Sequence, residues 1–191
     1  SRGKVGNFDG TNDHVIIPNS TSLQNVTDSS YTFEAWVRPV GIPVINGTNH
    51  NTDQYGIVMR PGSHSGISYN SGQKFQLQFY TAIWNGCAST DTFPQGSWHH
   101  VAGVIDDTQK MAYLYVDGVE QCSTPYSGNL KDYGTAAYYV GAARTGSTYT
   151  WFLKGQIDDV AIHNKALSLS EISVKAGLVS YIDTGLTLNT D

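Results

Sequence analysis

The stretch Tyr31-Thr32-Phe33-Glu34-Ala35-Trp36-Val37-Arg38 decides the fold class, because apolar side chains recur in it at every second position. Successive side chains of a β-strand point to opposite faces, which puts the odd-numbered residues on one face and Thr32, Glu34, Trp36 and Arg38 on the other. We expect the odd-numbered face to be buried. Glu34 is then expected on the sheet surface near Arg38, and Pro39 ends the strand.

Short strands are predicted along most of the chain, separated by clusters of Gly, Asn, Asp, Ser and Pro. Besides the first, they span residues 14–17, 57–59, 75–80, 98–105, 111–116, 137–141 and 155–162. In the 75–80 strand, Phe75, Leu77 and Phe79 are expected to point inward. Only the stretch from Ser168 to Ile172 is predicted to be helical, since Ser168 and Glu171 have the spacing of a capping box. This pattern predicts an all-β, two-sheet antiparallel sandwich or a barrel.

The composition fits a single domain over residues 1–191 and excludes several partners. Charged residues make up 14%, the net charge is −5, and no cluster of Lys and Arg is present. Nucleic acid and anionic lipid both require such a basic surface, and no apolar stretch is long enough to insert into a membrane. The chain opens Ser1-Arg2-Gly3 without Met, so we expect other domains of a larger parent protein as its neighbours.

Two cysteines, Cys87 and Cys122, allow one disulfide, with two buried free thiols as the alternative. An even count in a chain poor in Lys and rich in Tyr, Asn and Thr is typical of an oxidising compartment, which predicts an extracellular location. Such a bridge would stabilise the fold by roughly 3–4 kcal/mol on the loop-entropy description.

Several motifs occur in one order along the chain. They are Asn7-Phe8-Asp9-Gly10 with Asp13-His14-Val15, then 31–37, Trp98-His99-His100-Val101-Ala102, Leu114-Tyr115-Val116-Asp117-Gly118, and Gly155-Gln156-Ile157-Asp158-Asp159-Val160 running into Ala166-Leu167-Ser168. As an ordered set covering about residues 3 to 180, they resemble the laminin-G-like, concanavalin A-like jelly-roll modules of extracellular proteins. The resemblance implies two packed antiparallel sheets, one of them concave. Modules of this kind serve in glycan binding, adhesion and protein recognition, so the fold alone does not give the function, which has to be inferred from the residues of the site.

The resemblance also implies a structural calcium ion on the rim where the first and last strands meet. Calcium takes six to eight oxygen ligands, and carboxylates in turns supply them. The candidates are Asp9 and Asp13, which bracket a turn near the start, with Asp158 or Asp159 at the start of the last main strand. The alternative is that these aspartates only cap turns.

Catalysis is not expected from this sequence. Glycosidases need two carboxylates facing one cleft, and none of Glu34, Glu120 and Glu171 has a second carboxylate two or four places along. The Glu-x-Asp-x-x-Glu pattern of hydrolytic relatives is missing. The adjacent His99 and His100 would point to opposite faces of their strand and so are poorly placed to hold one metal ion.

Glycan binding requires an aromatic platform with amides or acids nearby, and two regions offer one. The first is a sheet face on which Trp36, Glu34 and Arg38 are expected beside Gln76, Gln78, Tyr80, Tyr113 and Tyr115. The second is a loop rim, formed by Trp84, Asn85, Tyr126, Tyr133, Tyr149 and Trp151 in Gly-, Ser- and Thr-rich connections. For Trp36 and Tyr80, packing within the sheet is the competing interpretation.

We therefore expect a non-catalytic carbohydrate-binding or adhesion module whose partner is a glycan or glycoprotein. Clustered exposed Trp and Tyr side chains around a groove would favour this hypothesis. A laminin-G-type protein-interaction module is the alternative, and a broad patch without a groove would favour it. A glycan hydrolase or lyase comes third, because it needs a convergent set of catalytic side chains.

Overall fold

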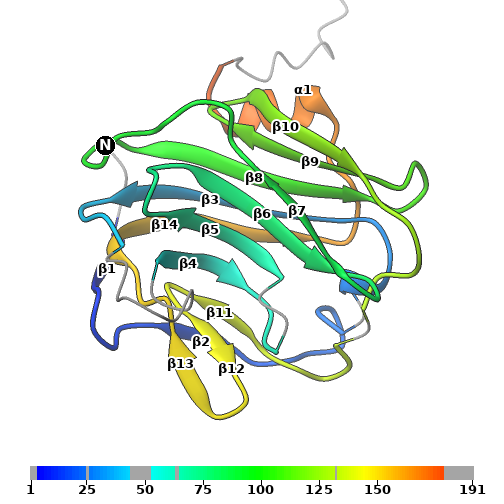
Figure 1. Cartoon of the computed structure of the whole chain (residues 1–191), viewed down its shortest axis with the longest axis horizontal. Coiled ribbons are helices and arrows are strands. Elements are labelled where there is room, and N and C mark those ends of the chain that lie inside the picture. Colours follow the sequence, from blue (N-terminus) through cyan, green and yellow to red (C-terminus); the bar gives the residue numbers. More distant parts are fainter. Residues whose placement is uncertain (1–3, 25, 44–52, 63–64, 132, 179–191) are drawn as a thin grey trace, which may run out of the picture.

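Two antiparallel sheets face each other in the computed structural model, which describes residues 4–24, 26–43, 53–62, 65–131 and 133–178 (Figure 1). Sheet A has the strand order β1-β14-β3-β8-β9-β10. These strands span Gly6–Asp9 (β1), Lys154–His163 (β14), Tyr31–Pro39 (β3), His99–Asp106 (β8), Met111–Val116 (β9) and Val119–Pro125 (β10). The predicted two-sheet β-sandwich is confirmed.

Sheet B has the strand order β2-β11-β4-β5-β6-β7. Its strands span Val15–Ile17 (β2), Tyr138–Val140 (β11), Gln54–Met59 (β4), Gly66–Asn70 (β5), Phe75–Tyr80 (β6) and Trp84–Ala88 (β7). A two-stranded hairpin of β12 (Ala143–Thr145) and β13 (Thr148–Thr150) packs on its outer face, where Met59 and Tyr139 contact Trp151. A 3₁₀ turn, η1 (Val26–Asp28), completes this half.

The core lies between the two sheets and follows the predicted alternation. Tyr31, Phe33, Ala35 and Val37 of β3 are at most 2% exposed, and Phe75, Leu77 and Phe79 of β6 belong to the same buried cluster. The backbone of Gly103 on β8 lies so near β6 that an added Cβ would come within 2.7 Å of a Leu77 methyl carbon. Close packing of this kind leaves room for functional sites only on the outer faces and at the ends of the sheets.

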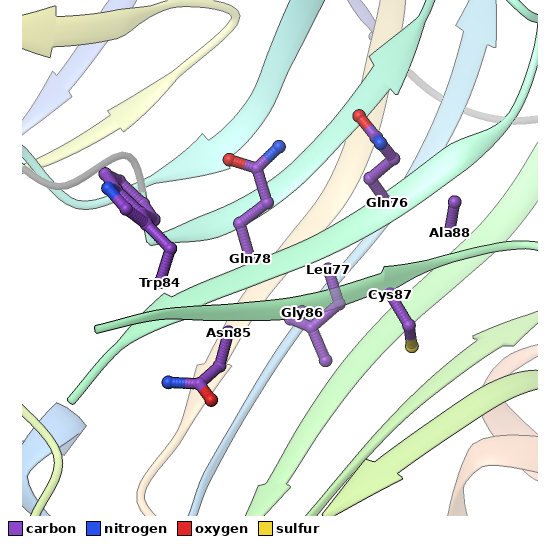
Figure 2. A pocket seen from close by; sticks show the side chains of 8 residues that line it. All are labelled: Gln76, Leu77, Gln78, Trp84, Asn85, Gly86, Cys87 and Ala88. Atoms are coloured by element: carbon purple, nitrogen blue, oxygen red, sulfur yellow. The ribbon is translucent and has the colours of Figure 1, made fainter. Parts of the chain in front are cut away.

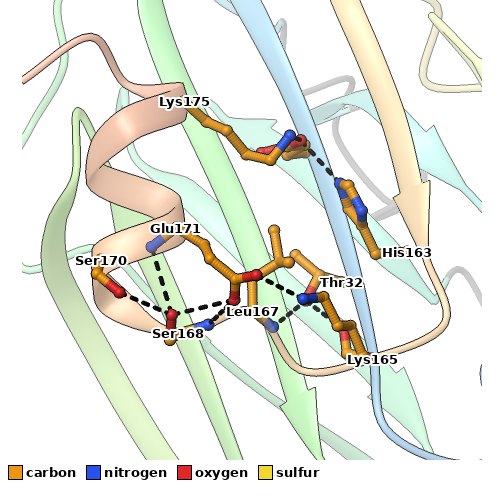
Figure 3. Close-up of polar contacts among 9 residues, drawn as sticks. Thr32, His163, Lys165, Leu167, Ser168, Ser170, Glu171 and Lys175 are labelled. Carbon is orange, nitrogen blue, oxygen red and sulfur yellow. Dashed lines mark hydrogen bonds and ion pairs between the residues drawn. The ribbon is translucent and has the colours of Figure 1, made fainter. Parts of the chain in front are cut away.

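The predicted helix also forms, as α1 (Leu169–Lys175), and it covers part of the outer face of sheet A. Its N-cap is Ser168, whose hydroxyl accepts from the Glu171 N–H while the Glu171 carboxylate accepts from the Ser168 N–H (Figure 3). This capping box satisfies two N–H groups that a helix start otherwise leaves unpaired. Ile172 is fully buried against Ala102 and Val104 of β8, so α1 is anchored to the sheet.

Candidate functional site

An open groove of about 350 Å³ lies on the outer face of sheet B over β6 and β7. Its lining residues are Gln76, Leu77, Gln78, Trp84, Asn85, Gly86, Cys87 and Ala88. Figure 2 shows the side chains of Gln76, Gln78 and Trp84 standing on one side of the two strands, with Leu77 and Cys87 on the other. We call this outer-face feature the β6–β7 groove.

Two glycines flank Gln78 in the sheet, and one of them, Gly86, lines the groove. In the strand register, Gln78 pairs with Gly86 of β7 on one side and with Gly66 of β5 on the other. The φ angles of Gly66 and Gly86 are +150° and +152°, values that residues with a side chain rarely adopt. Gln78 therefore has no side chain directly opposite it on either neighbouring strand, which leaves open space beside it.

Trp84 forms the wall of this groove at the sheet edge. Its side chain is 52% exposed although tryptophan is usually well buried, and its ring lies edge-on to Tyr80 with centroids 5.4 Å apart. An exposed indole held against a second ring is a rigid apolar platform with a polar edge. Such a surface suits ligands that present both an apolar face and hydroxyl groups.

Glutamine side chains lie beside Trp84, and hydrogen bonds hold two of them, Gln54 and Gln78, in place. Gln54 Oε1 accepts from Ser68 Oγ at 2.7 Å and from Gln78 Nε2 at 2.8 Å. These bonds hold the Gln78 side chain in one orientation. Gln76 Oε1 is buried and has no hydrogen-bond partner in the part of the chain that the structure describes. Gln78 is thus a preorganised polar group of the groove, and such a group binds a ligand at a lower entropic cost than a mobile one.

The structure corrects the prediction that one sheet face unites all the expected aromatic and amide residues. Trp36 lies on β3 and Tyr113 and Tyr115 on β9, all in sheet A, whereas Gln78 and Tyr80 lie on β6 in sheet B. The alternation was read correctly, but strand order depends on contacts distant in sequence. The two groups of residues therefore occupy different sheets of the sandwich.

The predicted loop rim also needs correction. Trp84 and Asn85 belong to β7 and not to a loop, and the Asn85 side chain turns away from Trp84 to donate to Thr81 Oγ1 and to the Ile83 carbonyl (Figure 2). Trp151 is 7% exposed and packs under the β12–β13 hairpin. Tyr149 lies on β13, where its ring contacts His14 with centroids 4.2 Å apart.

Tyr126 is likewise buried rather than presented at a rim. It is 7% exposed, packs edge-on against Phe79 and donates its hydroxyl hydrogen to Asp107. Burial, together with the hydrogen bond to Asp107, raises the pKa of its phenol far above the usual range. Tyr126 and Trp151 thus lie within the packed parts of the fold. The prediction placed them at a rim because the residues that flank them in the sequence are polar and give no sign that the rings turn inward.

A second hollow, of about 400 Å³, lies on the outer face of sheet A beside α1. Here Glu34 is buried, which corrects its predicted place on the sheet surface next to an arginine. Its Oε1 accepts from His163 Nε2 at 2.8 Å and from Lys175 Nζ at 2.7 Å, and its Oε2 accepts from His100 Nε2 at 3.2 Å. Figure 3 shows Lys175 of α1 and His163 of β14 converging from two elements.

The electrostatics of Glu34 make it a poor acid–base catalyst. Burial opposes its ionisation, but the hydrogen bonds from His100, Lys175 and His163 outweigh that effect and lower its pKa to about 2. A general acid or base works best with a pKa near the operating pH. Glu34 therefore serves to hold β8, β14 and α1 together rather than to exchange protons, even though Asp159 lines the same hollow.

The aspartates expected to bind calcium fall into two separate places. Asp13 Oδ2 accepts from the Asp9 N–H, and Asp9 Oδ1 accepts from the Thr11 N–H, so this pair caps its own turn. Asp9 pairs with Lys154 at the start of β14, whereas Asp158 and Asp159 follow four and five residues later, about 13 Å or more along the strand. Around Asp159, a bulge interrupts β14.

The four aspartates therefore do not fit a single calcium site. Among the residues that the structure describes, no group of three or more His, Cys, Asp or Glu side chains is placed to hold a metal ion. Calcium binding by the chain stays a prediction.

The predicted disulfide between Cys87 and Cys122 is present, with Cα atoms 6.2 Å apart. It joins β7, the edge strand of sheet B, to β10, the edge strand of sheet A. Gln121 next to it also links the sheets, because its Oε1 accepts from Thr90 and its Nε2 donates to Asp91. The strand that carries Trp84 is thus fixed to the opposite sheet.

The two facing antiparallel sheets form a jelly-roll sandwich of the concanavalin A-like kind. The family model described as the concanavalin A-like lectin/glucanases superfamily, of laminin-G type, matches residues 9–173. The chain belongs to this family, and the expected resemblance is confirmed. No curated protein matches the chain.

Solved structures share the fold at low sequence identity. The IT-sialidase CBM40 of Ruminococcus gnavus, bound to α2,3-sialyllactose, is 9% identical with a TM-score of 0.70, covering 91% of this chain and 98% of that one. A heptameric SAP-like pentraxin of Limulus polyphemus is 14% identical with a TM-score of 0.61, covering 89% and 80%. A sialidase of Trypanosoma rangeli is 16% identical with a TM-score of 0.62, covering 92% of this chain. The present chain covers only 27% of that sialidase.

Sequence reasoning found Trp84, Gln76 and Gln78 but missed the residues that assemble the groove around them. Gln54 and Ser68 were not singled out, because their role depends on the pairing of β4, β5 and β6. Gly66 and Gly86 carry a usable signal, since a glycine inside a strand often marks close backbone approach or a bulge. That signal becomes specific only when register places both glycines beside Gln78.

Proposed function

We propose that the chain is a non-catalytic carbohydrate-binding module that binds a glycan in the β6–β7 groove. The observation that carries this proposal is the exposed Trp84 ring standing beside the Gln76 and Gln78 side chains, of which Gln78 is held by its hydrogen bond to Gln54. A sugar ring has an apolar face of C–H groups and a rim of hydroxyls. The apolar face would pack on the indole, while the hydroxyls exchange hydrogen bonds with the amides.

The comparisons support this reading at the level of fold. The chain spans nearly the whole length of the Ruminococcus gnavus CBM40, whose structure holds an oligosaccharide, and only part of the Trypanosoma rangeli sialidase. The low pKa of Glu34 gives a hydrolytic function little support. Binding without chemistry is therefore the function that the groove favours.

The location we propose is extracellular, on a secreted or cell-surface parent protein with an adhesive role. The Cys87–Cys122 disulfide supports it, because disulfides persist in oxidising compartments and are rare in the cytosol. In the described ranges, the structure contains no helix with the length and apolar character needed to cross a membrane.

A glycan array tests the proposal with the wild type, Trp84→Ala and Ile83→Ala. Ile83 is a matched control, because it is 66% exposed and adjacent to Trp84 but does not line the groove. We expect at least one glycan to bind, with Trp84→Ala weakening it about tenfold, or ~1.4 kcal/mol, and Ile83→Ala leaving it unchanged. Absence of any bound glycan would overturn the proposal and favour a laminin-G-type protein-recognition role.

A further inference from the structure

The described side chains that line the β6–β7 groove carry no formal charge. Gln54, Ser68 and Tyr80, which border the lining residues, are also neutral. An acidic sugar placed over Gln78 would therefore give up hydration without gaining an ion pair. Moving a charge from water to a site without a partner is costly, whereas a hydroxyl needs only a hydrogen bond.

The hydrogen-bonding groups of the groove also favour a neutral ligand over an acidic one. Gln78 Nε2 donates one hydrogen bond to Gln54 Oε1, and a glutamine amide has a second N–H and an oxygen with which to bind a ligand. A sugar hydroxyl can donate to an amide oxygen and can accept from an amide N–H, so it suits both groups of the Gln78 side chain. A carboxylate or sulfate can only accept, so it could use an amide N–H but would face the amide oxygen as a second acceptor.

A cationic side chain, Lys131, lies near the Tyr80 end of the groove. The Lys131 ammonium is 5.5 Å from the Tyr80 ring centroid and 5.9 Å from the Tyr133 ring centroid. Its charge is thus directed at two ring faces rather than at the glutamine side chains. The whole chain, at a net charge of −5, also repels anionic ligands at long range.

We infer that the β6–β7 groove selects neutral hexose units and discriminates against acidic ones such as sialic acids, uronic acids and sulfated sugars. This specificity rests on the proposed function, since it concerns the same groove. It differs from the sialylated ligand in the structure of the Ruminococcus gnavus CBM40, which is 9% identical to this chain and shares its fold. The difference follows from the side chains of the groove and not from the backbone.

The test compares matched pairs of glycans, each neutral oligosaccharide with its sialylated or sulfated counterpart, on the wild type, Trp84→Ala and Gln78→Arg. We expect the wild type to bind the neutral member about tenfold more tightly and with little change between about 20 mM and about 500 mM NaCl, because no ion pair forms. Gln78→Arg places a cation among the glutamine side chains, so it should bind the acidic member more tightly than the wild type does, with an affinity that falls as salt rises.

The outcomes separate the two claims. If the wild type prefers the acidic member and Trp84→Ala abolishes that binding, the proposed preference for neutral sugars is wrong, but the groove remains the binding site. In that case, Lys131→Gln would abolish the acidic preference if Lys131 supplies the charge. Binding that is unaffected in Trp84→Ala, or no binding at all, would overturn the proposed function itself.

Discussion

Replacing Glu34 with glutamine should destabilise the protein strongly at neutral pH and weakly in acid. The pKa of Glu34 is about 2 in the folded protein against an ordinary value of 4.5. Because the pKa of Glu34 is lower in the folded protein than in the unfolded chain, its ionisation stabilises the fold fully at pH values above the unfolded-state pKa. This stabilisation is lost as the pH falls through the folded-state pKa. The difference between the two pKa values corresponds to roughly 3 kcal/mol of stability at neutral pH.

The glutamine variant tests the hydrogen-bond geometry as well as the charge. An amide places an NH₂ group where one carboxylate oxygen was, so it must face at least one of the three donors. His100 cannot easily adapt, because moving its proton to Nδ1 would put an N–H on a buried atom without a partner among the described residues. We therefore expect Glu34→Gln to lose about 2–4 kcal/mol, the range for breaking a buried pair, discounted because Lys175 and His163 can reach solvent.

Urea denaturation of the wild type, Glu34→Gln and the exposed control Glu120→Gln measures this effect at several pH values. The difference between the wild type and Glu34→Gln should fall from roughly 3 kcal/mol at about pH 6 to roughly 1.5 kcal/mol at about pH 3. Glu120→Gln should stay within about 0.5 kcal/mol of the wild type. A Glu34→Gln protein as stable as the wild type, or a difference that does not shrink in acid, would refute the described pairing.

The other predictions concern the disulfide, the helix cap and calcium. Replacing both Cys87 and Cys122 with serine should lower the free energy of unfolding by about 4 kcal/mol, measured by urea denaturation, and a loss below about 1 kcal/mol would contradict the cross-link's role. Ser168→Ala removes the N-cap of α1 and should cost about 1 kcal/mol, whereas Ser168→Asp should restore most of it. A chelator should leave the melting temperature unchanged if Asp9 and Asp13 only cap their turn, whereas a drop that added calcium reverses would support the calcium prediction.

The parts of the fold that were predicted from sequence are those with a local signal. The period-two alternation of 31–38 and 75–80 gave the buried faces of β3 and β6, and the Ser168 and Glu171 spacing gave the start of α1. The hairpin of β8 and β9 follows from a short polar turn between two apolar runs. In each case, the residues that define the element are neighbours in the chain.

The parts that were mispredicted depend on contacts distant in sequence. The alternation of its strand places Glu34 on the outer face of sheet A, which suggests exposure. Its burial depends on the packing of α1, which brings Lys175 over it. Trp151 and Tyr126 lie in polar segments, yet each ring packs against residues that are far away in the chain. The groove likewise depends on the strand pairing that sets Gly86 of β7 beside Gln78 of β6.

The most direct test of the account is to follow the indole N–H signals of the protein's four tryptophans by NMR during titration with a glycan that binds on the array. Spectra of Trp84→Phe and Trp36→Phe assign the two signals that matter. If the glycan occupies the β6–β7 groove, the Trp84 signal shifts in a saturable way while the Trp36 signal on sheet A stays in place. A saturable shift of Trp36 with an unmoved Trp84 would contradict the account, because it would put the glycan on the other sheet.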